Sequence, residues 1–124
     1  IDKKGINRMD CNLKIYTRME NMLNRIYPAL INFPKSEKYA VAQDIKNCFL
    51  EYLIYIARAD KVKSKRLVYS QEAEAYLQKI KTLMKLSKNR RYISIGFYKD
   101  ISLELTEISK MLAGYIRSIN RKKR

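Results

Sequence analysis

Several residue types that carry enzyme chemistry are absent from this sequence or rare in it. Histidine and tryptophan are missing, and there are only two cysteines, three glycines and two prolines. Without histidine the chain lacks the most common general base and zinc ligand, and two cysteines cannot complete a structural zinc site. The sequence also contains no glycine-rich phosphate-binding loop, nucleophile elbow or dinucleotide fingerprint. We therefore expect a protein without catalytic activity, cofactor or bound metal.

The acidic residues offer one candidate metal site. Glu104 and Glu107 are three residues apart, so a helix would place them on one face. This pair keeps a metal-dependent nuclease open as an alternative. Lys110 follows within reach, however, and acidic residues near the start of a helix are common on solvated surfaces. We favour the solvated surface.

Long apolar runs are also scarce. The most apolar stretch, residues 48–57, is interrupted by Glu51 and is far shorter than the roughly 20 residues that cross a bilayer. The start of the chain has no secretory signal pattern, and the Trp/Phe-rich pattern of interfacial helices is missing. We expect a cytoplasmic protein without membrane contacts, in which Cys11 and Cys48 are reduced and Cys48 is a small core residue.

What the sequence does contain is helical periodicity. Apolar residues recur at alternating three- and four-residue steps in four segments, and no β-type alternation competes. Pro34 would end the first helix, Ser36 would begin the second, Ser70 would cap the third, and Pro28 would kink the first. We predict an all-α, antiparallel up-down-up-down four-helix bundle that forms a single domain over residues 1–124. The expected helices cover residues 12–33, 36–60, 69–90 and 97–121.

The second of these segments is apolar around more of its circumference than one buried stripe requires. Leu50, Leu53, Ile54 and Tyr55 broaden the stripe. A helix that is apolar on most sides must be buried on more than one side. We expect a homo-oligomer with this helix near the subunit contact, although a central position in a monomeric bundle would also bury it.

Positive charge is the other abundant feature. The formal net charge is +15, and it is concentrated in two blocks. Residues 61–91 contain ten Lys/Arg against two Asp/Glu, and the tail 117–124 contains five Lys/Arg and no acidic residue. A chain this cationic repels itself, which favours an anionic partner such as nucleic acid.

The cations of the third segment are arranged in rows. Lys81, Lys85 and Lys88 are spaced four and three residues apart and line one stripe, whereas Lys79 and Arg90 share a second azimuth on the other flank. Such rows match the regular charge of a phosphate backbone, whereas a merely solubilising surface mixes both signs. The candidate nucleic-acid contacts are all cations of the two blocks: Lys61, Lys63, Lys65, Arg66, Lys79, Lys81, Lys85, Lys88, Arg90, Arg91, Arg117, Arg121, Lys122, Lys123 and Arg124.

An aromatic residue accompanies these cations. Tyr92 follows Arg90 and Arg91, and a tyrosine in a loop can stack on an unpaired base. Most of the ten tyrosines fall on helical stripes, where packing explains them better. For Tyr92 as well, we favour packing over stacking.

Four segments in order resemble a known family. They are "YPAL" at 27–30, "FPK" at 33–35, "IARADK" at 56–61 and "GYIRSINRK" at 114–122. Over about residues 15–123 the chain resembles the four-helix-bundle family associated with intervening sequences of large ribosomal RNA. Within that family it is most similar to the accessory variability determinants of diversity-generating retroelements.

The resemblance implies a non-catalytic, basic protein that assembles into a homopentameric barrel. Its implied partners are the element's reverse transcriptase and template-repeat RNA, with DNA or an RNA–DNA hybrid as further ligands, and its implied role is to support error-prone cDNA synthesis (mutagenic retrohoming). Arg121 and Lys122 match the family's basic end of the last helix, and Lys79 or Gln78 falls near its basic position on the third helix. The alternative is an oligomeric scaffold of the ribosomal type with a protein partner.

Overall fold

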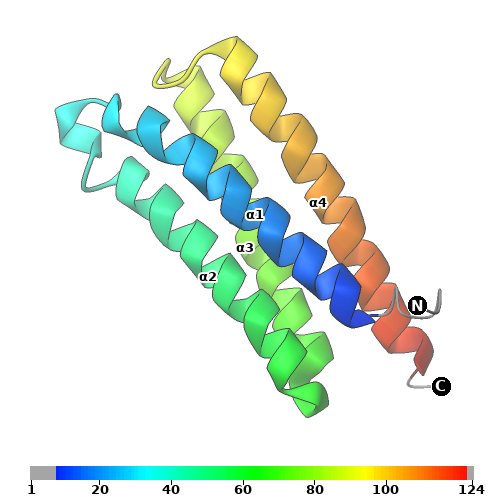
Figure 1. The fold of residues 1–124 in the computed structure, drawn as a ribbon. Coiled ribbons are helices and arrows are strands. Elements are labelled where there is room, and N and C mark those ends of the chain that lie inside the picture. Colours follow the sequence, from blue (N-terminus) through cyan, green and yellow to red (C-terminus); the bar gives the residue numbers. More distant parts are fainter. Residues whose placement is uncertain (1–7, 123–124) are drawn as a thin grey trace.

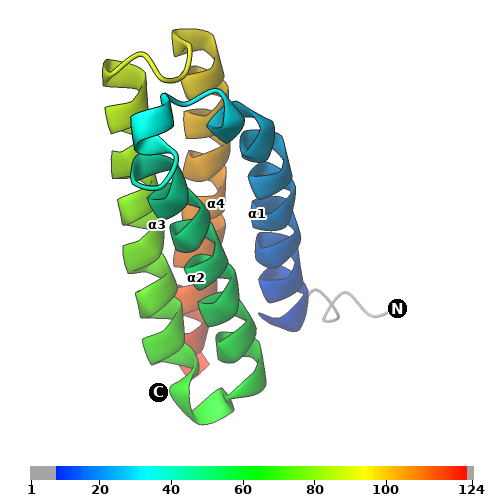
Figure 2. The ribbon, with the colours of Figure 1, turned by 90° about the vertical axis from the view of Figure 1, so that its left-hand side faces the viewer.

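The computed structural model describes residues 8–122, with side chains for residues 11–121, as four α-helices and no strand. The helices are α1 (Arg8–Ile31), α2 (Val41–Lys61), α3 (Arg66–Asn89) and α4 (Ile95–Lys122). They run antiparallel in chain order, so that the α2–α3 connection lies at the same end as the last turn of α4 (Figure 1). The view from the side shows the same four helices side by side, with their axes nearly aligned (Figure 2). The predicted four-helix bundle is confirmed for the described residues.

The start of α2 differs from the sequence prediction. The chain forms a short 3-10 helix, η2 (Lys35–Glu37), and α2 begins only at Val41, not at residue 36. Pro34 starts the short turn, in which the Glu37 amide donates to the Pro34 carbonyl at 2.8 Å. The turn ends before α2 because Ala40, at φ −121° and ψ −99°, leaves helical geometry.

The start of α3 also differs, because Ser70 is not its cap. The α2–α3 connection contains a second 3-10 helix, η3 (Lys63–Lys65), and α3 begins at Arg66, one turn before Ser70. Arg66 fixes this early start by donating from Nε to the Ala59 carbonyl at 2.7 Å and from its terminal nitrogen to the Asp60 carbonyl at 2.9 Å. Ser70 is therefore buried inside the helix, and its hydroxyl has no hydrogen-bond partner.

The first and last helices are longer than predicted at their amino ends. In α4, the Ser94 hydroxyl accepts a hydrogen bond from the Phe97 amide at 3.0 Å, which makes Ser94 the amino-terminal cap. Gly96 consequently lies inside the first turn instead of before it. The helix α1 extends through exposed Pro28, which lacks the amide that would bond to the Asn24 carbonyl, and ends one turn later at Ile31.

The core is one apolar cluster to which all four helices contribute. Its largest fully buried side chains include Tyr52, Tyr115 and Phe49, and Cys48 is buried as predicted. Leu53 belongs to the core as well, at 6% exposure, but Leu50 and Ile54 are 49% and 42% exposed. The bundle therefore accounts for only part of the broad apolar surface of α2.

Candidate nucleic-acid interface

The two rows of cations on α3 lie on different flanks of the helix. The Lys88 ammonium lies 4.9 Å from the ring centroid of Tyr98 on α4, and Lys81 lines a groove together with α4 residues. Lys79 instead lies beside α2, where its positive charge opposes the increase that burial causes in the pKa of the Cys48 thiol. The row Lys81, Lys85 and Lys88 thus borders α4, whereas Lys79 lies on the α2 side.

The outer face of α4 carries further cations, on the side of the molecule where Lys81, Lys85 and Lys88 lie. Lys99, Lys110, Arg117 and Arg121 are exposed and are spaced eleven, seven and four residues apart, which keeps them on one helical face. Arg117 and Arg121 belong to the predicted set, whereas Lys99 and Lys110 do not. Their spacing is the signal that could have included them. We call these four residues together with Lys81, Lys85 and Lys88 the α3–α4 basic face.

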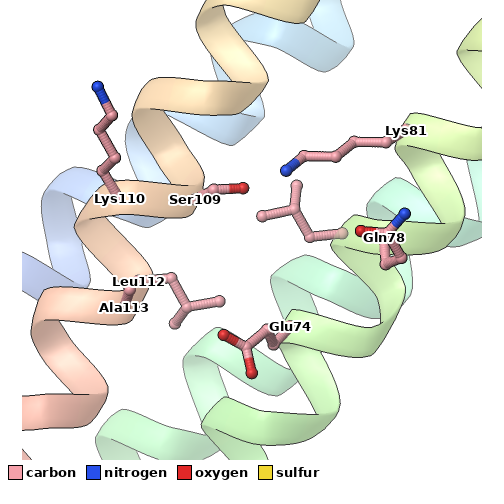
Figure 3. A pocket seen from close by; sticks show the side chains of 8 residues that line it. Glu74, Gln78, Lys81, Ser109, Lys110, Leu112 and Ala113 are labelled. Carbon is pink, nitrogen blue, oxygen red and sulfur yellow. The ribbon is translucent and has the colours of Figure 1, made fainter.

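A groove of about 470 Å³ separates α3 from α4 on this face. Figure 3 shows the Lys81 ammonium and the Ser109 hydroxyl extending into the groove, and the Glu74 carboxylate entering it from the other end. Leu77 and Leu112 form an apolar part of its wall. Lys81 also borders a second hollow of about 210 Å³, which it shares with Tyr98, Ser102 and Thr106.

The basic face continues to the end of the bundle where α3 meets α4. Arg91 adopts a left-handed backbone with φ of 63°, and the Tyr92 amide donates to the Ser87 carbonyl at 2.8 Å. With the bond from the Arg91 amide to the Lys88 carbonyl at 2.9 Å, this is a Schellman motif, whose left-handed position usually holds glycine. Arg91 and the neighbouring Arg90 are both exposed.

Tyr92, the candidate for base stacking, has a packing role. Its hydroxyl donates to the Glu37 carboxylate at 2.7 Å, and its ring centroid lies 5.2 Å from that of Phe33. The hydrogen bond to Glu37 is the main reason why the pKa of Tyr92 is raised. Tyr92 thus connects the α3–α4 turn to the α1–α2 turn, in agreement with the packing interpretation.

The predicted cations of the α2–α3 connection lie at the opposite end. Lys61, Lys63 and Lys65 are exposed, whereas Arg66 is half-buried by its bonds to the last turn of α2. Arg121 belongs to the last turn of α4, and that turn lies at the same end of the bundle (Figure 1). The remaining predicted tail contacts lie outside the described side chains: Lys122, Lys123 and Arg124.

The candidate metal pair is divided between two ion pairs. Glu104 accepts two hydrogen bonds from the Arg18 guanidinium of α1, at 2.8 and 3.0 Å, and Glu107 lies 3.5 Å from the Lys110 ammonium. The bond to Glu104 also raises the pKa of Arg18. Among the described residues, no three His, Cys, Asp or Glu side chains lie close enough together to hold a metal ion.

The surface where α2 meets α3 has a different character from the α3–α4 basic face. Tyr55 lies 5.8 Å from Tyr69 and 5.7 Å from Tyr76 between ring centroids, and the Arg58 guanidinium lies 5.0 Å from the Tyr55 ring. Glu51 and Glu72 are close enough to this cluster that their charges help to raise the pKa of Tyr76, after desolvation. Cations and anions are thus balanced here, an arrangement that the sequence analysis missed.

The fold and this face define a class of protein: a basic antiparallel four-helix bundle that carries rows of cations on α3 and α4. A family model described as bAvd-like matches residues 13–119, and the chain belongs to that family. This membership agrees with the resemblance to accessory variability determinants. Comparisons with curated proteins and with solved structures give no match. Across the residues that the structure describes, no helix has the length and apolar character needed to span a bilayer.

Proposed function

We propose that the chain is a non-enzymatic RNA-binding accessory subunit of a diversity-generating retroelement. It binds the template-repeat RNA and the element's reverse transcriptase, and it supports cDNA synthesis during mutagenic retrohoming. The observation that carries the proposal is the gathering of seven cations on the α3–α4 basic face of a bAvd-like chain. We place its action in the cytoplasm, where template RNA and polymerase meet.

The geometry of the basic face suits a phosphate backbone. Lys81, Lys85 and Lys88 rise along α3 in steps of about 6 and 4.5 Å, since each residue advances the helix by about 1.5 Å. Ser102 and Ser109 supply hydroxyls between α3 and α4, and hydroxyls are common phosphate ligands. Each lysine that neutralises a phosphate releases counterions, which makes binding strong in dilute salt and weak in concentrated salt.

The second part of the proposal is assembly into a homopentamer through the outer surface of α2. Copies with a net charge of +15 repel each other, so they associate best where charges are balanced. The surface where α2 meets α3 is such a place, because Glu51 and Glu72 accompany Arg58 and Lys79. Exposed Leu50 and Ile54 add an apolar surface beside it. Assembly also multiplies the RNA affinity of one basic face without new contacts.

Light scattering tests the assembly. We expect the wild type to have a mass roughly five times the 14.8 kDa of one chain. The double variant Leu50→Glu/Ile54→Glu should reduce this to one chain while the helical circular dichroism spectrum persists, because charge is costly in a buried contact. Leu103→Glu is the matched control, since Leu103 is 70% exposed on α4. A monomeric wild type, or equal masses for all variants, would contradict assembly through α2.

Recovery of the bound molecules from the native host tests the cellular role. The tagged wild-type chain should capture template-repeat RNA, identified by sequencing, and a reverse transcriptase, identified by mass spectrometry. Lys81→Glu/Lys85→Glu/Lys88→Glu should lose the RNA, because three phosphate contacts become repulsive. Capture of ribosomal components without a reverse transcriptase would instead support the scaffold of the ribosomal type.

A further inference from the structure

We infer that the groove between α3 and α4 binds a single unpaired guanine nucleotide of the RNA. The inference rests on the proposed function and adds base selectivity to it. It starts from Glu74, an acidic residue that lines the groove. Within residues 11–121 Glu74 forms no ion pair or hydrogen bond, although Lys81 lines the same groove. An acidic side chain weakens phosphate binding unless it also recognises part of the ligand.

The order of polar groups along the groove matches one nucleobase. Glu74, Gln78 and Lys81 are spaced four and three residues apart, so they form one stripe that presents a carboxylate, an amide and an ammonium. The stripe is about 10 Å long, from the rise of seven helical residues. This is comparable to the extent of one nucleotide between its phosphate and the pairing edge of its base.

Guanine presents two adjacent donors, the 2-amino group and N1–H, followed by the O6 acceptor. The two oxygens of Glu74 can accept from both donors, and the amide of Gln78 can donate to O6. The phosphate then lies toward Lys81 and the Ser109 hydroxyl, which extend into the groove (Figure 3). Adenine, cytosine and uracil lack two adjacent donors on this edge, so each leaves one oxygen of Glu74 opposite an acceptor or without a partner.

The size and walls of the groove also suit a base. Its volume of about 470 Å³ is in the usual range for sites that bind small molecules. Leu77, Leu112 and Ala113 supply apolar surface for the ring. The pairing edge of a guanine in a duplex is already occupied, so the ligand must be single-stranded, as in most sequence-specific recognition of RNA.

Fluorescence anisotropy with labelled single-stranded RNA tests the inference. The probes are 12-nucleotide oligouridylates that carry one central guanine, one central inosine or no replacement. The wild type should bind the guanine probe roughly tenfold more tightly than oligouridylate, as expected for a bidentate base contact. Inosine lacks the 2-amino group and should fall between the two.

Two variants, each of which removes one negative charge, separate base recognition from the general effect of charge. Glu74→Gln should bind all three probes equally, because the amide replaces one acceptor with a donor. Glu20→Gln removes the same charge from an exposed position on α1, outside the residues that line the groove, and should keep the preference. Both residues are exposed, so both variants should retain the thermal midpoint of the wild type.

Each outcome has one meaning. Loss of the guanine preference in Glu74→Gln alone supports the site. Equal binding of the three probes by the wild type, or an equal preference in both variants, overturns the guanine site but leaves RNA binding intact. If the wild type binds no probe even in dilute salt, the proposed function itself fails.

Discussion

At the scale of single residues, two buried hydroxyls lack hydrogen-bond partners in the described part of the chain, those of Tyr52 and Ser70. A buried polar group without a partner costs free energy, because it loses its bonds to water on folding. Burial also raises the pKa of Tyr52, since the ionised form is poorly solvated in the core.

Tyr52→Phe should therefore stabilise the bundle. We expect the free energy of unfolding at pH 7 to rise by about 1 kcal/mol, because the unpaired hydroxyl is removed. The gain should be larger above about pH 10, the unfolded pKa of tyrosine. The raised pKa keeps folded Tyr52 neutral there while the unfolded chain ionises, so the wild type loses stability as the pH rises.

Urea denaturation at pH 7 and pH 10.5 measures both effects. Tyr39→Phe is the control, because Tyr39 is 90% exposed and should change neither value. A loss of stability in Tyr52→Phe would show that the hydroxyl has a partner in solution.

Arg91 is the second residue for which the backbone makes a clear prediction. Its φ of 63° costs about 1–2 kcal/mol for a residue with a Cβ, and glycine adopts this conformation readily. We expect Arg91→Gly to stabilise the protein by about 1 kcal/mol, after the greater entropy of the unfolded glycine is deducted.

Arg90→Gly is the matched control for Arg91→Gly. Arg90 has an ordinary right-handed conformation with φ of −86°, and its replacement removes the same charge. It should therefore destabilise the protein slightly, by less than about 1 kcal/mol. Equal thermal midpoints for the two variants would refute the strain at Arg91.

At the scale of elements, an ion pair connects the first helix to the last. Arg18 and Glu104 form two hydrogen bonds, but their side chains are 37% and 27% exposed, so solvent weakens the attraction. A double-mutant cycle with Arg18→Ala and Glu104→Ala should give a coupling free energy of about 0.5 kcal/mol that decreases in 1 M salt. No coupling in dilute salt would show that the pair is not formed in solution.

The helices themselves were predictable, but their starts were less so. The spacing of apolar residues depends only on the helical repeat, so all four helices could be assigned from the sequence. Ser70 has the chemistry of a cap, yet Arg66 bonds to the end of α2 and starts α3 earlier. Such contacts between elements cannot be read from a single sequence. The cap of α4, Ser94, lies three residues before the start at residue 97 that the sequence predicts.

At the scale of the whole molecule, the concentration of positive charge was predictable from the sequence, but the shape of the groove between α3 and α4 was not. The row Lys81, Lys85 and Lys88 follows from spacing on one helix. The groove requires the relative positions of Glu74 on α3 and Ser109 on α4, which only the packing of the two helices fixes. The same packing assigns Arg66, one of the predicted cations, and Tyr92, which follows two of them, to contacts within the protein.

The dependence of RNA affinity on salt tests the central claim, that the α3–α4 basic face binds RNA. For single-stranded RNA, log Kobs falls with log salt by about 0.7 per phosphate contact. Lys81→Glu/Lys85→Glu/Lys88→Glu should bind weakly and reduce the slope by about 2, because three contacts are lost.

The control is Lys14→Glu/Lys35→Glu/Lys38→Glu, which changes three exposed cations of α1 and the α1–α2 connection by the same total charge. It should keep a slope close to that of the wild type. If the two triple variants have the same affinity and the same slope, RNA is not bound at the α3–α4 basic face.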